Sequence, residues 1–270
     1  MTTRAKWGQN FLSDDNIARK CVAALQLTPQ DTVLEIGPGK GALTKHLLAQ
    51  AQQVIAVELD RELYTFLQQE YPDQKNLILH NQDFLDTDLR ALNLGHSYKI
   101  ISNLPYAVCA PILQKLLGFS RWQRMVVMVQ REVAERMVCP HGSKNYGILS
   151  ISVQVQSQVK KLFHVPKGCF RPVPKVESTV LELLPHRKPL LKSVNEKIFF
   201  TVVRAAFAHR RKTLINSLER HLEISSAEID RILRACKVNP KLRAEKVSVE
   251  QFCAIAKMMP AGKKKKKLVR

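Results

Sequence analysis

The sequence predicts an α/β fold with a mostly parallel sheet covered by helices on both faces, followed by a smaller all-α domain. Two observations predict the sheet: a short apolar run at 33–36 leads directly into a glycine-rich turn, and apolar segments of strand length then alternate with helical patterns. A third predicts the second domain, since every periodic segment after residue 194 has helical spacing. We therefore expect an α/β domain at 1–185 and a helical domain at 186–262.

The chain opens with an N-terminal arm, residues 1–13, ahead of the first helix. Ser13–Asp15 supplies capping oxygens and negative charge at a helix start, and apolar residues recur at helical spacing from Ile17 onward. Trp7 and Phe11 lie in the arm outside any predicted element. They fit a flap that covers a ligand or an arm packed on the core, and the residues alone leave both open.

The segment Asp31–Thr44 is the one around which the rest of the chain is organised. A buried strand is expected at Val33–Ile36, the turn follows at Gly37–Gly41, and a helix begins at once at Ala42. Glycines at alternate positions allow a sharp turn and leave no side chain between the strand end and a ligand. We expect a flat, polar ligand there. A nicotinamide dinucleotide and S-adenosylmethionine both remain open, because the glycine spacing fits either cofactor.

Strands and helices continue to alternate through the α/β domain. Strands are expected at 53–57, 77–80, 99–102, 124–129, 148–155 and 179–184, and helices at 42–50, 61–69, 111–117 and 131–137. Right-handed crossovers then place the carboxyl ends of the parallel strands at one edge of the sheet, where ligands of such folds bind. The last two strands are expected to be antiparallel edge strands. In the second domain, helices are expected at 195–208, 212–222, 227–235 and 249–258.

Three polar residues follow strands at this carboxyl edge. Glu58 lies twenty-one residues past Gly37, where a carboxylate can accept both ribose hydroxyls of an adenosine. Asp83 suits an acceptor for the adenine amine, with an aspartate in an ordinary surface turn as the alternative. Asn103 follows the strand expected at 99–102. Together with the glycine turn, these residues define a nucleoside-binding site.

The turn Asn103–Tyr106 indicates the chemistry. Asn103 and the backbone of Leu104 and Pro105 offer carbonyl oxygens to one planar amine, and Tyr106 offers a ring to stack on the attached base. The turn holds no proton relay of the kind a dehydrogenase needs, so it favours methyl transfer to the exocyclic amine of adenine. Two acceptors that hold the amine protons draw this poorly nucleophilic nitrogen toward tetrahedral geometry. The alternative is structural, with Asn103 capping the turn and Tyr106 packing on the core.

Composition excludes several classes of protein. Hydrophobic residues make up 45% of the chain, enough for a packed core, and no apolar run approaches the roughly 20 residues of a membrane span. The start of the chain lacks the apolar stretch of a secretory signal. The six cysteines are scattered without metal-ligand spacing, so we expect free thiols and no metal. A cytoplasmic protein with no membrane association is the simplest interpretation.

The positive charge is concentrated in the last third of the chain. The net charge is +20, and residues 186–270 contribute +15 of it through 22 basic and 7 acidic side chains. This asymmetry favours a nucleic-acid partner over a merely solvated basic face. Arg210, Arg211 and Lys212 lie between two predicted helices, where they can bind phosphates from a fixed platform. The lysine-rich tail at 263–270 is expected to be disordered and to add non-specific affinity.

Five motifs in one order resemble the rRNA adenine dimethyltransferases over nearly the whole chain. They are Gly8–Leu12, Glu35–Gly41, Val57–Asp60, Asn103–Tyr106 and Phe170–Ser178. The leucine of the Asn-Leu-Pro-Tyr turn favours the members that modify the small-subunit (16S) rRNA over their erythromycin-resistance relatives, which modify the large subunit. The resemblance implies a Rossmann-like class I methyltransferase fold, S-adenosylmethionine as cofactor, and dimethylation of two adjacent adenosines near the 3′ end of the rRNA.

The resemblance also implies roles for individual residues. Asn10 and Leu12 would close over the cofactor, Gly37 would lie beside its methionine part, Glu58 would bind the ribose, Asp83 the adenine, and Asn103 would act at the reacting end. Tyr106 and Phe170 would clamp the target adenine. The implied partner is the immature small ribosomal subunit, and we expect the chain to act as a monomer. A non-catalytic RNA-binding assembly factor on the same fold remains the alternative from another class.

Overall fold

The computed structural model describes residues 10–119, 121–209 and 211–260. The chain forms two compact units, which are described separately. The first contains the described residues up to Val138 together with Ser157–Pro185. The second contains Cys139–Gln156 and the described residues from His186 onward. Arg210, most of the N-terminal arm and the lysine-rich tail lie outside the described residues.

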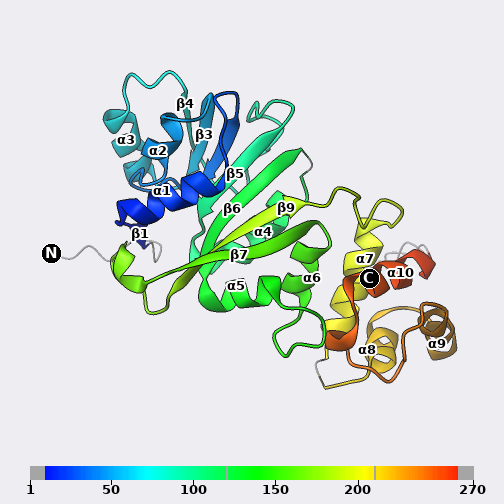
Figure 1. Ribbon diagram of the computed structural model, residues 1–270. Coiled ribbons are helices and arrows are strands. Elements are labelled where there is room, and N and C mark those ends of the chain that lie inside the picture. Colours follow the sequence, from blue (N-terminus) through cyan, green and yellow to red (C-terminus); the bar gives the residue numbers. More distant parts are fainter. Residues whose placement is uncertain (1–9, 120, 210, 261–270) are drawn as a thin grey trace, which may run out of the picture. The chain divides into compact units, whose positions relative to one another are not determined.

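The first unit is built on a twisted sheet whose described strands follow the order β4-β3-β2-β5-β6-β9-β7 (Figure 1). The strands are β2 (Thr32–Ile36), β3 (Gln53–Glu58), β4 (Leu77–Asn81), β5 (Tyr98–Asn103), β6 (Trp122–Gln130), β7 (Ser157–Val165) and β9 (Ser178–Pro185). The pairs among β2 to β6 are parallel, and β9 pairs antiparallel with both β6 and β7. The predicted α/β fold with a mostly parallel sheet is confirmed.

The order of the strands fixes where a ligand can bind. The chain runs outward from β2 through β3 to β4, then returns to place β5 and β6 on the other side of β2. In such sheets the crevice at this reversal, outside the carboxyl ends of the strands, is the usual ligand site. Ile36 at the end of β2 pairs with Ser102 near the end of β5, and the Ser102 hydroxyl donates to the Ile36 carbonyl at 2.7 Å. The two strand ends are therefore held together at the reversal.

The first unit has five α-helices among the described residues. They are α1 (Asp15–Ala24), α2 (Thr44–Leu48), α3 (Arg61–Glu70), α4 (Cys109–Leu117) and α5 (Arg131–Val138). Asp14 caps α1 by accepting from the Ile17 amide at 3.1 Å, as the Ser13–Asp15 pattern predicts. No helix in the described part of the chain is long and apolar enough to cross a membrane.

Residues 148–155 are predicted as a strand, and this prediction is wrong. They form helix α6 (Ile148–Gln154), which belongs to the second unit and lies beside α7 (Glu196–Phe207) (Figure 1). Ile151 and Val155, one helical turn apart, are buried in the core of that unit. From 149 to 155 apolar and polar residues alternate, which is the pattern of a strand, and packing in the helical core overrides this local pattern.

The edge of the sheet is instead formed by β7, and this placement corrects the expected continuous domain at 1–185. The chain leaves the first unit after Val138, contributes Cys139–Gln156 to the helical core, and returns as β7 beside β9. Since β9 is antiparallel to both β6 and β7, β7 runs in the same direction as the central strands. An insertion from one unit into another leaves no local signal in the sequence.

The second unit is a cluster of helices around its own apolar core. Besides α6 and α7 it contains α8 (Leu214–His221), α9 (Ser226–Ala235) and α10 (Val249–Met258). The fully buried side chains of Phe199, Leu218, Leu233 and Phe252 come from four different helices of this unit. The helical C-terminal region predicted from the spacing of apolar residues is thus present.

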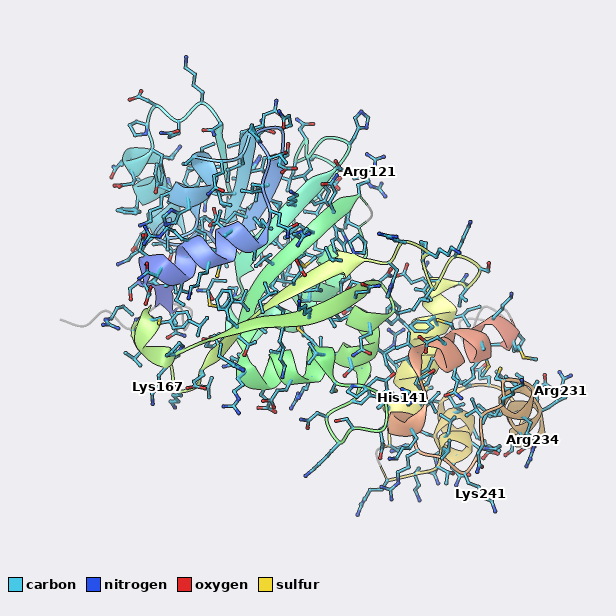
Figure 2. All side chains as sticks on the ribbon, in the orientation of Figure 1. Arg121, His141, Lys167, Arg231, Arg234 and Lys241 are labelled. Carbon is cyan, nitrogen blue, oxygen red and sulfur yellow. The ribbon has the colours of Figure 1, made fainter. Side chains whose placement is uncertain are left out.

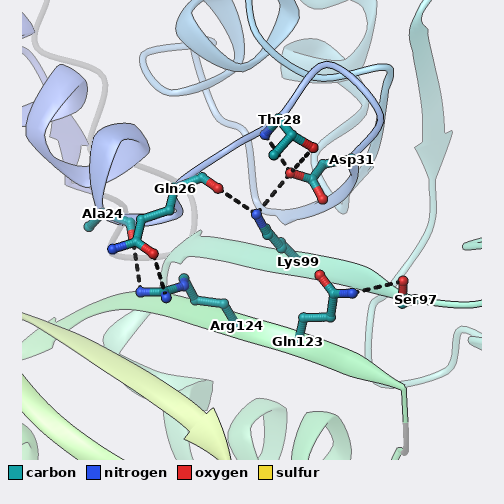
Figure 3. A network of polar contacts seen from close by, with 8 residues as sticks. All are labelled: Ala24, Gln26, Thr28, Asp31, Ser97, Lys99, Gln123 and Arg124. Atoms are coloured by element: carbon teal, nitrogen blue, oxygen red, sulfur yellow. Dashed lines mark hydrogen bonds and ion pairs between the residues drawn. The ribbon is translucent and has the colours of Figure 1, made fainter.

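The amino end of the parallel sheet carries a network of paired charges (Figure 3). Lys99, at the start of β5, donates to the Gln26 carbonyl at 2.6 Å and to Asp31 Oδ2 at 2.8 Å. Asp31 also accepts from the amide and hydroxyl of Thr28 at 2.6 and 3.0 Å. Burial acts to raise the pKa of Asp31, but the hydrogen bonds from Lys99 and Thr28 outweigh it and the net pKa is lowered. Beside this network, Arg124 forms an ion pair with Glu182.

Candidate active site

A pocket of about 270 Å³ opens at the carboxyl edge of the sheet, where β2, β3 and β5 end. Its volume is near the lower end of small-molecule sites. Nine of the residues predicted from the sequence line it: Asn10, Leu12, Gly37, Glu58, Asp83, Asn103, Leu104, Pro105 and Tyr106. The fold therefore brings together side chains from five separate stretches of the chain.

The glycine turn forms the floor of the pocket, and its glycines have different reasons to be there. Gly37 has φ +66°, and a Cβ built on it would meet no atom within 4 Å, so the missing side chain leaves open space for a ligand. At Gly39 a Cβ would lie 3.1 Å from the Phe11 ring. Only the first of these two glycines thus serves the ligand directly, whereas the second admits the ring of the N-terminal arm.

Two buried carboxylates lie at the pocket without a cation beside them. Neither Glu35 nor Glu58 forms an ion pair with any residue that the structure describes, although they are only 1% and 3% exposed. Burial raises the pKa of both, to about 8 for Glu35, whose Oε2 accepts from the Thr44 hydroxyl at 2.8 Å. A pocket edged by such groups fits a ligand that brings hydroxyl donors or positive charge.

Glu58 is already oriented by the backbone around it. Its Oε2 accepts from the Gly39 amide at 3.0 Å, and its Oε1 accepts from the Asp60 amide at 2.9 Å. A carboxylate oxygen has two lone pairs, so each can still accept a ribose hydroxyl. The same residue therefore holds the glycine turn in place and presents acceptors to the pocket.

The side-chain carbonyl of Asn103 is available to a substrate. Its Nδ2 donates to the Asn10 carbonyl at 3.2 Å, which orients the amide group, and no described residue donates to its Oδ1. The Leu104 amide donates to the Met128 carbonyl at 3.0 Å and fixes the turn on β6. The turn therefore presents an acceptor at a fixed position, which is the arrangement that an amine with two N–H groups requires.

Tyr106 is anchored at its hydroxyl. The phenolic oxygen lies 2.8 Å from the Ser178 hydroxyl at the start of β9. Burial raises the pKa of this phenol. The ring lines the pocket beside Pro105. An anchored ring at this place suits stacking on a base, because little side-chain freedom remains to be lost when the base binds.

The structure does not bring Phe170 into the pocket. Its side chain is fully buried in the apolar core that includes residues of α1, and it is absent from the pocket lining. Its backbone pairs with Leu12 in a two-stranded ladder between β1 (Phe11–Leu12) and β8 (Phe170–Arg171). In this conformation Phe170 pairs with Leu12, which lines the pocket, and its own side chain does not lie where the stacking role implied by the resemblance requires it.

Asp83 begins a tight turn at the far wall of the pocket. Its Oδ1 accepts from the Leu85 amide at 2.7 Å, which is the turn geometry typical of aspartate. The residue lines the pocket together with Phe84 and Leu85. The two interpretations of Asp83 from the sequence are therefore compatible, because one carboxylate oxygen builds the turn and the other can accept from a ligand.

The second unit carries a basic hollow. It is lined by Gly142, Lys144, Arg211, Arg243, Glu245 and Lys246. None of its four cationic side chains forms an ion pair with a described residue. By contrast Arg231 and Arg234, which Figure 2 labels on α9, pair with Glu228 and Asp230. Lys212 is exposed next to Arg211. Unpaired cations gathered in a hollow are typical of a phosphate-binding surface.

Glu35 and Lys246 were not predicted as site residues from the sequence. A carboxylate inside the apolar run Val33–Ile36 was a signal for Glu35, since a buried acid in a strand needs a reason. Lys246 gave no comparable signal. All six cysteines are free, and within the described residues no cluster of three or more histidine, cysteine, aspartate or glutamate side chains is arranged to hold a metal ion.

Comparison with known proteins gives a consistent result. The family model described as "Ribosomal RNA adenine dimethylase" matches residues 1–260. The chain is 39% identical to the ribosomal RNA small subunit methyltransferase A of Caldanaerobacter subterraneus subsp. tengcongensis, over 95% of this chain and 97% of the relative. It is 40% identical to the protein of the same name from Moorella thermoacetica, over 96% of this chain and 93% of the relative.

Solved structures agree with the fold. A dimethyladenosine transferase from Plasmodium falciparum superposes with a TM-score of 0.78 at 25% identity, covering 91% of this chain and 95% of the other. The 23S rRNA methyltransferase ErmE superposes with a TM-score of 0.70 at 23% identity, covering 91% and 98%. The second likeness concerns the fold alone.

Proposed function

Because the chain belongs to the ribosomal RNA adenine dimethylase family, we propose that it dimethylates the exocyclic amines of two adjacent adenosines near the 3′ end of the small-subunit (16S) rRNA. It is an S-adenosylmethionine-dependent rRNA adenine dimethyltransferase by its family. The choice of the small-subunit rRNA is supported by the names of the relatives and by the leucine in the turn Asn103–Tyr106. The observation that carries the proposal is the free carbonyl of Asn103 in the same pocket as Glu58.

The residues of the pocket fit the cofactor. Glu58 would accept hydrogen bonds from the ribose hydroxyls, and Asp83 would accept one from the adenine amine. The open space over Gly37 would hold the methionine part of the cofactor. Asn10 and Leu12 would close over the bound cofactor. When bound, S-adenosylmethionine supplies a methyl group on a positively charged sulfur. The Glu58 carboxyl group at the pocket has no cation beside it among the described residues, and its ionised form favours binding of a cationic ligand over a neutral one.

Asn103 and Tyr106 would act on the target base. The Asn103 carbonyl and the backbone carbonyls of the following turn accept the two amine protons of adenine, while the Tyr106 ring stacks on the base. These acceptors become stronger partners as the nitrogen leaves the plane of the ring, so they lower the barrier more than they stabilise the bound substrate. After one methyl transfer a single N–H remains for Asn103, which allows the second transfer at the same site.

The basic hollow would hold the RNA backbone. Arg211, Lys212 and the hollow beside them offer exposed, unpaired cations to phosphates, and Arg210 belongs to the same predicted patch. Binding should weaken steeply with salt, and reversing the charge of Arg211 and Lys212 should flatten this dependence. Reversal of Arg231 and Arg234, which are paired on α9, is the matched control and should change the salt dependence less.

The proposal is tested by methyl transfer from radiolabelled S-adenosylmethionine to immature small ribosomal subunits, followed by analysis of the modified base. We expect N6,N6-dimethyladenosine at two adjacent positions of the rRNA. Transfer to large-subunit rRNA instead would identify an enzyme of the erythromycin-resistance type. Binding of subunits without transfer would identify a non-catalytic assembly factor. The proposed partner is thus the immature small subunit, with the chain acting as a monomer in the cytoplasm.

A further inference from the structure

Lys115 connects two walls of the cofactor pocket. It lies on α4, which continues from the turn Asn103–Tyr106 through a short 3-10 segment, Tyr106–Val108. Ile112, three residues earlier and on the same face of the helix, lines the pocket. The half-buried ammonium of Lys115 therefore comes from the wall that carries the reacting end of the site.

The partners of this ammonium all belong to the turn Asp83–Thr87, of which Asp83, Phe84 and Leu85 line the pocket. Nζ of Lys115 donates to the carbonyl oxygens of Phe84, Leu85 and Thr87 at 2.8, 2.6 and 2.6 Å. The same nitrogen lies 5.4 Å from the centre of the Phe84 ring. The turn itself is closed by the Thr87 amide and hydroxyl, which donate to the Asp83 carbonyl at 3.0 and 2.8 Å. Three carbonyls of one turn thus converge on one side chain.

The number of donors matches the number of acceptors. An ammonium has three N–H groups, and each can serve one of the three carbonyls. These carbonyls end a single helical turn that does not continue. Among the described residues, the Leu85 and Thr87 carbonyls have no other donor, and the Phe84 carbonyl accepts only a longer bond from the Thr87 amide at 3.3 Å. Lys115 forms no ion pair with any described residue, so its ammonium interacts with the carbonyls of the turn and not with a carboxylate.

We propose that Lys115 is a positioning residue that fixes the Asp83–Thr87 turn at the adenine end of the cofactor site, and thereby sets the affinity for S-adenosylmethionine and the preference for adenine. The proposal rests on the proposed function, in which Asp83 accepts the adenine amine. Without the lysine, the three carbonyls lose their donors and the turn loses the contact that holds Asp83, Phe84 and Leu85 against the pocket.

Lys99 provides a matched control within the same domain. It also uses its ammonium to join a loop to the sheet, but at the amino end, through the Gln26 carbonyl and Asp31 (Figure 3). None of these three residues lines the pocket. Lys115→Met and Lys99→Met therefore make the same chemical change, the first at the cofactor site and the second away from it.

The test measures rRNA methylation by full-length Lys115→Met, Lys99→Met, Asp83→Ala and wild-type protein. KM for S-adenosylmethionine and kcat are determined at saturating RNA, together with the ratio of the inhibition constants of S-inosylhomocysteine and S-adenosylhomocysteine. The inosine compound carries a carbonyl in place of the adenine amine. We expect Lys115→Met to raise KM on the order of tenfold, to leave kcat within about a factor of two, and to reduce the preference for the adenine compound.

The outcomes separate the inference from the proposed function. A wild-type KM and inhibitor ratio in Lys115→Met, with a reduced ratio in Asp83→Ala, overturns the role of Lys115 alone. An unchanged ratio in both variants overturns the adenine contact of Asp83 and the inference with it. An equal rise in KM for Lys99→Met shows general destabilisation and also overturns the inference. If Lys115→Met does not fold, Lys115→Arg takes its place, because a planar guanidinium cannot direct its N–H groups at the three carbonyls as an ammonium does. Lys115→Arg should shift KM and the inhibitor ratio in the same direction. Wild-type values of both in Lys115→Arg overturn the proposal.

Discussion

The two ends of the parallel sheet differ in how their polar side chains are paired. Strand β5 begins with Lys99, whose ammonium is paired with Asp31, and ends with Asn103, whose side-chain carbonyl has no donor among the described residues. At the amino end Arg124 is also paired, with Glu182. At the carboxyl end Glu35 and Glu58 are buried without a described cation. The same strands thus carry paired charges at one end. At the other end they carry hydrogen-bonded carboxyl groups without a described cation and an amide carbonyl without a described donor.

We infer from this difference that the polar groups at the amino end serve stability and those at the carboxyl end serve function. A buried polar group without a partner costs free energy, so a fold retains it where something other than folding requires it. A bound nucleoside and an amine would supply the missing partners at the carboxyl end. Substitutions at the amino end should therefore change stability, and those at the carboxyl end should change binding or turnover.

Asn103→Ala should have the largest effect. The variant should lose roughly 10² to 10³ in kcat, because one preorganised acceptor that strengthens in the transition state has been removed. Binding of RNA should persist. The measurement is single-turnover methylation beside an RNA-binding titration.

Asn76→Ala is the matched control for Asn103→Ala. Asn76 precedes β4 at the amino end, where its Nδ2 donates to the Leu48 and Ala51 carbonyls at 3.0 and 3.2 Å. The control should lose stability and keep its rate. A near-normal rate in Asn103→Ala would show that the turn is structural, and equal loss of RNA binding would place the effect on docking.

Lys99→Met should lower the free energy of unfolding by about 3 kcal/mol, the lower end for breaking a buried ion pair, since Asp31 keeps its contacts with Thr28. The kcat and KM of the folded variant should equal those of the wild type. Urea unfolding and steady-state methylation check the two halves of this prediction. A changed KM in fully folded protein would show that the amino end influences the site.

Glu58→Ala should weaken binding of S-adenosylmethionine by about 1.5 to 3 kcal/mol, the value of hydrogen bonds to a charged acceptor. Part of this loss comes from the glycine turn, because Glu58 also holds the Gly39 amide. Calorimetry in the presence of RNA measures the affinity. Glu62→Ala, at an exposed site on α3, is the control and should bind normally. Unchanged affinity in Glu58→Ala would remove this carboxylate from the site.

The sequence was sufficient where local pattern decides the structure. The Ser13–Asp15 cap, the strand at Val33–Ile36 and the polar residues after the strands can be read from spacing, and the structure brings Glu58, Asp83 and Asn103 into one pocket. Local pattern fails where long-range packing decides. Residues 148–155 became a helix because a core built from later helices accepts them.

Other site features depend on contacts that are distant in the sequence. Phe170 is buried because it packs near α1 and pairs with Leu12, more than 150 positions earlier in the chain. Lys115 gains its role only from the turn at Asp83–Thr87, which precedes it by about thirty residues. Neither contact leaves a periodic signal in the sequence, so neither can be predicted without the fold.

The last prediction concerns the pH dependence of stability. Burial raises the pKa of Glu35 to about 8, well above the ordinary value of a glutamate. The folded state therefore holds a proton that the unfolded chain releases, and the contribution of Glu35 to stability, fully present below about pH 4.5, declines as pH rises toward 8. Asp31 at the amino end has the opposite sign, because its lowered pKa makes its contribution decline only under acidic conditions.

Glu35→Gln isolates this contribution, because the amide is neutral at every pH and has nearly the same shape as the protonated acid. From about pH 6 to about pH 7 the variant should gain about 1.4 kcal/mol in unfolding free energy relative to the wild type, the value for one proton over one pH unit. Glu58 is present in both proteins, so its raised pKa largely cancels in the difference. Urea unfolding at several pH values provides the measurement. Parallel curves for the two proteins would show that Glu35 is ionised when folded, and the contrast between the two ends of the sheet would then rest on Glu58 and Asn103 alone.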